Sequence, residues 1–218
     1  MTIVPFPTVL AKEQLRVLMQ NADDYRLAKA ARMTRTRRAS RLTLRVRLIR
    51  PDDAAVLTDI FARLSSESRL ARFLYPKTAL SDAELRYLSD VDHRHHEALI
   101  AVTRFHGDPV GVARFIRNDG DPATAEIAFA IVDEWQNRGV GSMLATRLAQ
   151  RALRENISHF TALTAAGNLR ARRLLGKLGD VRVVRREGPT VFYRVALAGP
   201  APVSHRPRGV SLVPASGT

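Results

Sequence analysis

The chain has 218 residues, of which 45% are apolar and 26% charged, a balance typical of a soluble globular protein. It contains no cysteine, which excludes disulfides, thiol nucleophiles and cysteine-ligated zinc. No apolar run approaches the roughly 18 residues of a membrane span, and no secretory signal pattern opens the chain. We therefore expect a cytoplasmic protein that makes no membrane contact.

The net charge of +14 is concentrated near the N-terminus. Residues 1–50 carry 12 basic and 3 acidic side chains, whereas residues 51–195 carry 21 and 18. Ten basic residues and no acidic one lie from Arg26 to Arg50, so this arm is a candidate contact for a polyanion. A compositional bias is the alternative, because the whole chain uses 31 arginines against 4 lysines.

Three regions follow from the patterning. Residues 1–40 form a basic extension, with apolar spacing that predicts a helix over 10–31. Residues 41–198 form the main domain. Residues 199–218 are rich in proline, serine and glycine, which predicts a disordered tail.

The first half of the domain predicts one strand, two helices and a meander. Apolar residues alternate over 42–48, and Pro51 and Asp52 then end this strand and begin a helix that extends to Leu64. Ser81 and Glu84 indicate a capped second helix through Leu88. Strands are predicted over 97–105, 109–117 and 124–132, joined by short turns that require antiparallel pairing.

The second half alternates helices and strands. A helix is predicted over 141–155, a strand over 160–164, a helix over 168–178, and strands over 181–185 and 190–197. This order indicates an α/β domain with one mixed central sheet flanked by helices.

The segment after the third meander strand has the composition of a phosphate-binding turn. A helix N-terminus offers unpaired N–H groups and partial positive charge. Gly139 and Gly141 allow close approach there, and Arg138 adds a full charge. The segment lacks the Gly-Lys-Ser/Thr ending of nucleotide-triphosphate loops and the third glycine of dinucleotide loops. A simple glycine turn is the alternative.

Two motifs together resemble the GNAT N-acetyltransferase superfamily. Gln136 to Gly141 reads Gln-Asn-Arg-Gly-Val-Gly, which is similar to the family's Gln/Arg-x-x-Gly-x-Gly/Ala motif for acetyl-coenzyme A. Asn168 to Gly179 resembles the family's Asn-x-x-Ala-x-x-Leu-Tyr-x-Lys-x-Gly helix. The likeness covers about residues 42–197 and implies a mostly antiparallel GNAT sheet with splayed strands at the coenzyme.

The resemblance implies a set of coenzyme contacts. Backbone groups of Ile131 and Val132 would pair with the pantetheine arm, and an N–H at Ile131 would stabilise the oxyanion formed from the thioester. Asn168 and Arg172 would contact pantetheine or phosphates, although a solvated helix face is an equal reading for Arg172. The pyrophosphate would lie in the loop formed by Gln136, Asn137, Arg138, Gly139, Val140, Gly141 and Ser142.

Proton transfer needs a base, because an amine near pKa 10 must lose a proton before it attacks. Glu126 is the first choice, at a position where many family members place this base. Glu134 and Asp133 are alternatives, and Asp133 could merely shape the turn. The alternative is that Glu126 is a solvent-exposed strand residue without a catalytic role.

The chain departs from the family pattern twice. Leu175 stands where a tyrosine often protonates the thiolate, which leaves Tyr193 or water for this role. Asp180 replaces the usual phenylalanine after the helix glycine. Because of these departures, an alternative function stays open. In this alternative the chain is a non-catalytic module that senses acyl-CoA and uses its basic arm to bind nucleic acid or an acidic partner.

Three histidines and two acidic residues lie within residues 92–97, but these six residues are contiguous and cannot all converge on one ion, so we predict no metal. The segments around Ser66–Phe73 and Leu88–Ala101 resemble bacterial protein-lysine acetyltransferases. We therefore predict direct transfer from acetyl-CoA to an amine, with a protein lysine as first choice and a small amine second. A covalent cysteine intermediate is excluded. The oligomeric state stays open between monomer and homodimer.

Overall fold

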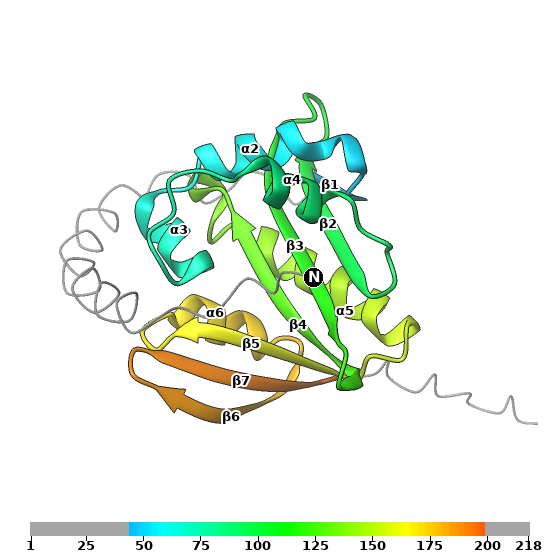
Figure 1. Ribbon diagram of the computed structural model, residues 1–218, viewed down its shortest axis with the longest axis vertical. Coiled ribbons are helices and arrows are strands. Elements are labelled where there is room, and N and C mark those ends of the chain that lie inside the picture. Colours follow the sequence, from blue (N-terminus) through cyan, green and yellow to red (C-terminus); the bar gives the residue numbers. More distant parts are fainter. Residues whose placement is uncertain (1–43, 199–218) are drawn as a thin grey trace, which may run out of the picture.

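The computed structural model describes residues 44–198, which fold around one seven-stranded sheet (Figure 1). The strands are β1 Leu44–Leu48, β2 His96–Thr103, β3 Pro109–Asn118, β4 Asp121–Ile131, β5 His159–Ala165, β6 Gly179–Glu187 and β7 Thr190–Leu197. The helices are α2 Ala54–Ala62, α3 Ser66–Phe73, α4 Asp82–Ser89, α5 Val140–Arg154 and α6 Leu169–Leu175. Two short 3-10 helices, η2 Pro51–Asp53 and η3 Asp133–Trp135, precede α2 and α5.

The strand order is β1-β2-β3-β4-β5-β7-β6, and β4–β5 is the one parallel pair of this sheet. Short turns make β2, β3 and β4 an antiparallel meander. Parallel neighbours need a longer crossover, which α5 supplies between β4 and β5. The predicted mixed, mostly antiparallel sheet is confirmed. No helix within residues 44–198 is long and apolar enough to cross a membrane.

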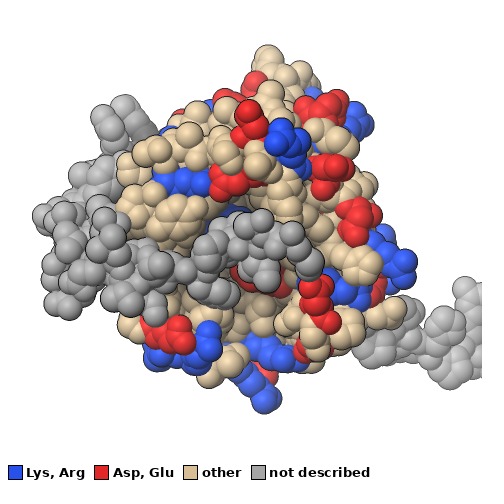
Figure 2. Space-filling model, in the orientation of Figure 1, with Lys and Arg blue, Asp and Glu red and all other residues tan. Residues whose placement is uncertain are grey.

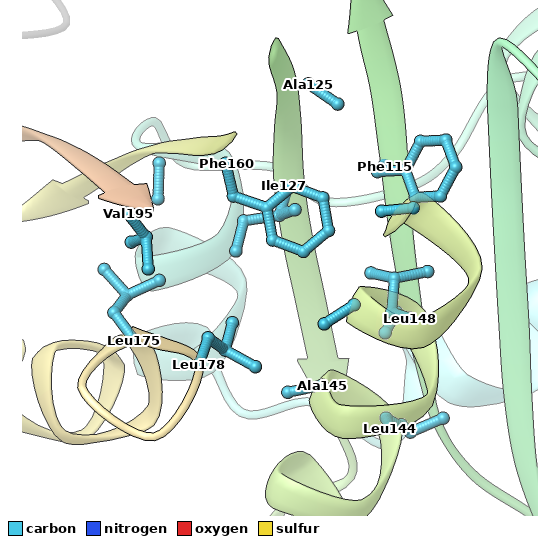
Figure 3. Close-up of a cluster of buried hydrophobic side chains, with 14 of the residues drawn as sticks. Phe115, Ala125, Ile127, Leu144, Ala145, Leu148, Phe160, Leu175, Leu178 and Val195 are labelled. Carbon is cyan, nitrogen blue, oxygen red and sulfur yellow. The ribbon is translucent and has the colours of Figure 1, made fainter. Parts of the chain in front are cut away.

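The larger core lies between the sheet and α5 (Figure 3). Leu144, Leu148 and Ala152 recur every fourth residue, so they share one face of α5, and all three are fully buried. They pack with Phe115 and Phe160, whose ring centroids lie 6.1 Å apart. Burying one such leucine stabilises the fold by about 1.5–3 kcal/mol.

A second core covers the opposite face of the sheet. Leu57 and Ile60 of α2 pack there with Ile100 and Val112 from the sheet. Because α5 and α2 cover the two faces of the central strands, β2 is buried without interruption from Glu97 to Val102. This double coverage explains an apolar run that lacks the alternation of a half-buried strand.

The prediction of two helices before the meander was wrong, because α3 is a third. Three of its eight residues are apolar, Leu70, Ala71 and Phe73, and none of the eight is buried. Capping defines this helix instead: the Ser65 side chain accepts from Ser68 N at 3.2 Å, and Leu74 ends it in the left-handed region with φ 62°. The remaining boundaries moved by a few residues, as at Thr103, where a turn ends β2. The extension 1–40, its helix over 10–31 and the tail 199–218 lie outside the described residues.

Candidate active site

The central feature of the site is the separation of β4 from β5. The two strands pair over three positions, Thr124 with His159, Ala125 with Phe160 and Glu126 with Thr161. Beyond Glu126, β4 continues to Ile131 and pairs with β3 alone. In Figure 1 the strands lie together at the lower right and diverge toward the left. The last five residues of β4 therefore have one edge without a strand partner in the sheet.

The backbone of Ile131 is directed toward this open edge. The N–H of Val132 donates to Val110 O at 3.0 Å, so Val110 and Val132 form a hydrogen-bonded pair of the antiparallel ladder. Hydrogen-bonded and non-hydrogen-bonded pairs alternate, so the next pair, Gly111 with Ile131, turns its N–H groups outward. Of the two predicted backbone contacts, Ile131 faces the opening, whereas Val132 is bonded to β3 and its side chain is fully buried.

Left-handed residues shape the loop that leads into α5. Asn137 has φ 60° and Gly139, the N-cap, has φ 87°. α5 begins at Val140, and the first helix-closing bond that involves the cap runs from Met143 N to Gly139 O at 3.0 Å. The N–H groups of Val140, Gly141 and Ser142 consequently have no acceptor within the helix. They form a positive helix terminus next to the open edge of β4.

Gln136 ties this loop to its surroundings. Its side-chain Nε2 donates to Ile131 O at 3.0 Å and to Ser68 Oγ at 2.9 Å, while its Oε1 accepts from Arg170 at 2.8 Å. One amide thus joins β4, α3 and α6. These contacts make Gln136 a positioning residue for the loop.

Two cations accompany the α5 terminus. Lys177 Nζ donates to Ser142 Oγ at 2.7 Å, and the Arg138 guanidinium lies 5.4 Å from the centroid of the Trp135 ring. Gly141 lies beside α6, where a Cβ would be 3.6 Å from Leu174 Cδ2. The arrangement suits a phosphate anion, because full charges reinforce the helix terminus.

The two predicted residues of α6 differ in their surroundings. Asn168 is the N-cap, and its Oδ1 accepts from Ala171 N at 3.0 Å. Arg172 is exposed, and its guanidinium makes no hydrogen bond or ion pair with any residue in the described range. Asn168 therefore fixes the start of α6, while the Arg172 side chain is solvated in this structure.

Glu126 stands where β4 and β5 part, on the β4 face that also carries Ala128 and Ala130. Its side chain reaches solvent. Desolvation by the surrounding walls raises the pKa of its carboxyl, and the positive charge of Arg72 opposes this rise. A carboxylate with a raised pKa beside an open strand edge has the properties of a general base.

The alternative bases have other contacts. Asp133 accepts from Ser65 N at 2.8 Å, Ser65 Oγ at 3.0 Å and Ser68 Oγ at 3.1 Å. It thereby attaches the start of α3 to η3. The sequence left open a structural role for Asp133 in the turn, and these bonds agree with a structural role. Glu134 is exposed and lies 3.5 Å from Arg63. Sequence reasoning missed Ser65 and Ser68, whose spacing before Leu70 was the available capping signal.

Of the two residues that depart from the family pattern, Leu175 is buried and Asp180 is exposed. Leu175 and Tyr193 belong to the main core, with exposed fractions of 2% and 5%. Strand alternation places Tyr193 inward, which removes it as a proton donor to a thiolate. Asp180 is exposed and pairs with Arg182 at 3.1 Å. The preceding Gly179 is required, because a Cβ would lie 1.8 Å from Ala196 O.

The histidine-rich turn has a structural role. The Asp92 carboxylate accepts from the N–H groups of Arg94, His95 and His96 at 2.8–2.9 Å, and although burial opposes it, these bonds hold its pKa below the usual range. Glu97 is fully buried and bonds His93 Nδ1 at 2.7 Å and Arg151. Within residues 44–198 no group of three histidine, aspartate or glutamate side chains is placed to hold a metal.

A mixed sheet whose central parallel strands separate next to a helix N-terminus is the arrangement expected of a GNAT acyltransferase. Residues 41–180 match the family model described as acetyltransferase (GNAT) domain. The chain therefore belongs to the GNAT acetyltransferase family, an acyltransferase class of enzyme.

Named relatives agree with this assignment. Acetyltransferase Pat of Mycolicibacterium smegmatis is 30% identical over 138 residues, which are 63% of this chain and 41% of Pat. Acetyltransferase PA5475 of Pseudomonas aeruginosa is 28% identical over 155 residues, 70% of this chain and 83% of that protein. This chain thus spans about two-fifths of the length of Pat.

Solved structures share the fold. The GNAT domain of S. lividans PAT matches with a TM-score of 0.64 at 28% identity, over 71% of this chain and 90% of that one. The yncA protein of Salmonella typhimurium, solved with its cofactor acetyl-CoA, matches with a TM-score of 0.57 over 72% of this chain and 96% of that one. At 22% identity, the second likeness concerns the fold alone.

Proposed function

We propose that the chain transfers an acetyl group directly from acetyl-CoA to an amine. The observation that carries the proposal is the unpaired edge of β4 beyond Glu126, which ends at the N-terminus of α5. An extended pantetheine arm can bond to such an edge as an added strand would. The pyrophosphate then meets the N–H groups of Gly139, Val140, Gly141 and Ser142.

The reaction needs one polarised carbonyl and one base. The N–H of Ile131 is the donor we assign to the thioester oxygen, where negative charge develops as the amine nitrogen attacks. Glu126 takes the proton of the incoming ammonium, directly or through water. The tetrahedral intermediate then expels the thiolate as the C–S bond breaks, and the nitrogen releases its second proton to water. Water is the proton source we assign to the thiolate, since Leu175 and Tyr193 are core residues.

A protein lysine is our first choice of acceptor. The support is the sequence resemblance to bacterial protein-lysine acetyltransferases, together with the likeness to Pat and to the S. lividans PAT domain. A small amine is the second choice. The cytoplasmic location, the polyanion contact of the basic arm and the choice between monomer and homodimer stay predictions.

The test measures coenzyme A release with lysine peptides and acetyl-CoA affinity by calorimetry. We expect Glu126→Gln to lower turnover about a hundredfold and to leave acetyl-CoA affinity unchanged. Because the pKa of Glu126 is raised, the turnover of the wild type should fall with decreasing pH, with a midpoint above the usual pKa of glutamate. The pH profile of the variant should lack this decrease. Glu134→Gln is the matched control and retains turnover.

Two results would contradict this assignment in different ways. Normal turnover by Glu126→Gln would remove this carboxylate as the base. A wild-type chain that binds acetyl-CoA without releasing coenzyme A to any acceptor would favour the acyl-CoA-sensing module instead.

A further inference from the structure

A recess opens on the face of the sheet that carries Glu126. Its floor is formed by Val112 and Arg114 of β3 and by Ala128 and Ala130 of β4. Its walls come from the helices and the segments between them, namely Leu57, Ile60, Phe61, Leu64, Arg72, Phe73, Leu80 and Leu88. Glu126 precedes Ala128 and Ala130 on the same face of β4. The recess therefore lies along the same face of β4 as Glu126, the group that we propose to deprotonate the acceptor.

Arg114 is a nearly buried cation in this recess, with an exposed fraction of 4%. Its Nη1 lies 3.2 Å from Leu88 O, to which it donates, and 3.0 Å from His96 Nε2. Burial and the charge of Arg114 lower the pKa of His96 to about 4, although Asp92 opposes the change, so this imidazole is neutral near pH 7. Burial and Arg72 lower the pKa of Arg114 to about 9, which still leaves it charged. Both hydrogen-bond partners of this cation are thus uncharged.

Arg72 is the second cation of the recess. Its guanidinium lies 4.9 Å from the centroid of the Phe73 ring, and it makes no hydrogen bond or ion pair with any residue in the described part of the chain. Burial lowers its pKa, and Glu126 is the described carboxylate that opposes this change. Arg72 in turn acts on Arg114, so the two positive charges lie close enough to repel each other.

The charges of the recess are unbalanced. Arg72 and Arg114 contribute two positive charges, and Glu126 is the one described carboxylate that acts on either of them. Proton transfer does not relieve this imbalance, because the negative charge that Glu126 loses is matched by the positive charge that the ammonium gives up. Desolvated charges are unfavourable unless a counter-charge compensates them. An acceptor that brings only its ammonium would add a third positive charge.

From this imbalance we infer that the acceptor carries an anionic group, a carboxylate or a phosphate, close to the amine that is acetylated. Arg72 and Arg114 hold this anion within the recess while the amine faces Glu126. Guanidinium groups suit the task, since they bind carboxylates and phosphates through directed N–H bonds. In a protein acceptor the anion is an acidic or phosphorylated side chain next to the lysine. In a small acceptor it belongs to the same molecule as the amine. The inference rests on the proposed acetyl transfer.

The experiment compares acceptors that differ only in the anion. One pair consists of lysine peptides with glutamate or glutamine on both sides of the lysine. The other pair consists of 4-aminobutyrate and its carboxamide. The wild-type chain should prefer the acidic member by about tenfold in kcat/KM, the value of one charged hydrogen bond. Preference within the peptide pair alone identifies a protein acceptor, and preference within the small-molecule pair alone identifies a small one.

The test uses variants of Arg72 and not of Arg114, because Arg114 is buried and replacing it would risk unfolding the chain. Arg72→Gln should abolish the preference for the anion while acetylation of the neutral member continues, and Arg72→Lys should restore part of it. Arg86→Gln, an exposed change on neighbouring α4, is the control and keeps the wild-type preference.

Equal kcat/KM within both pairs, or an unchanged preference in Arg72→Gln, would overturn the inference while acetyl transfer itself stands. Absence of transfer to all four acceptors, with acetyl-CoA bound, would instead overturn the proposed function on which it rests.

Discussion

Gly139 shows how one residue prepares the site. Its φ of 87° lies in the region that favours glycine, and it is the N-cap from which α5 departs. A side chain there would meet no atom within 4 Å, so space does not explain the glycine. The backbone angle does, because an L-residue in the left-handed region is disfavoured by about 1–2 kcal/mol.

We expect Gly139→Val to weaken acetyl-CoA binding, because the branched side chain shifts the loop and turns the α5 N–H groups away. Calorimetry measures the loss of affinity. Gly107→Val is the matched control, since Gly107 has φ 76° and equally open surroundings in the β2–β3 turn. Comparable strain there should lower stability without changing affinity. If Gly139→Val bound acetyl-CoA with the affinity of the wild type, the assignment of this loop to the pyrophosphate would be refuted.

At the scale of elements, α5 links the core to the site. Its apolar face packs on the sheet through Leu144 and Leu148, and this packing fixes where the helix begins. Gln136 and the Lys177–Ser142 hydrogen bond then position the loop and α6 around that beginning. The location of the helix terminus is therefore a consequence of core packing.

Leu148→Ala should lower the free energy of unfolding by about 2–5 kcal/mol, because a fully buried side chain leaves a cavity. Urea denaturation gives the difference. Val184→Ala removes apolar atoms from a side chain that is 62% exposed and should change stability by at most about 0.5 kcal/mol. Equal losses in the two variants would show that α5 does not anchor the fold.

At the scale of the whole molecule, the charge is unevenly distributed. Figure 2 shows basic and acidic side chains interspersed over the described part of one face, in accordance with 21 basic and 18 acidic residues over 51–195. The excess of basic over acidic residues lies in residues 1–50, at the N-terminal end of the sequence. A polyanion contact is accordingly expected of the arm and not of the enzyme domain.

Acid stability is a second property of the whole fold. Asp53 has a side-chain exposure of 7% and accepts from Arg47 at 2.5 and 2.6 Å and from Arg50 N at 2.8 Å. Burial would raise the pKa of Asp53, but these bonds hold it below its usual value. A carboxyl with a lowered folded-state pKa stabilises the fold above its unfolded pKa and loses this contribution as the pH falls.

We therefore expect the free energy of unfolding to decrease as the pH falls below about 4, the pKa of an unfolded aspartate. Asp53→Asn should be less stable than the wild type at pH 7, and the difference between them should shrink on acidification. Urea denaturation across this pH range measures both curves. A constant difference between the curves would contradict the assigned role of Asp53.

Local sequence patterns determined much of this protein. Short turns between consecutive strands predicted the meander of β2, β3 and β4, and the glycine motif predicted the start of α5 within one residue. Such features depend on neighbours in the chain, because periodicity and capping are local properties. The family also followed from local motifs, whereas the role of Glu126 as the base stays a prediction.

Tertiary structure decided what distant segments do to one another. The attachment of Ser65 to Asp133, the anchoring of Gln136 and the burial of Tyr193 depend on contacts between segments far apart in the chain. The meeting of Arg72 and Arg114 near Glu126 belongs to the same class, since each lies on a different element. A local sequence pattern predicts on which face of a helix or strand a side chain lies. Only the packing of these elements against one another determines which charged side chains come together in one recess.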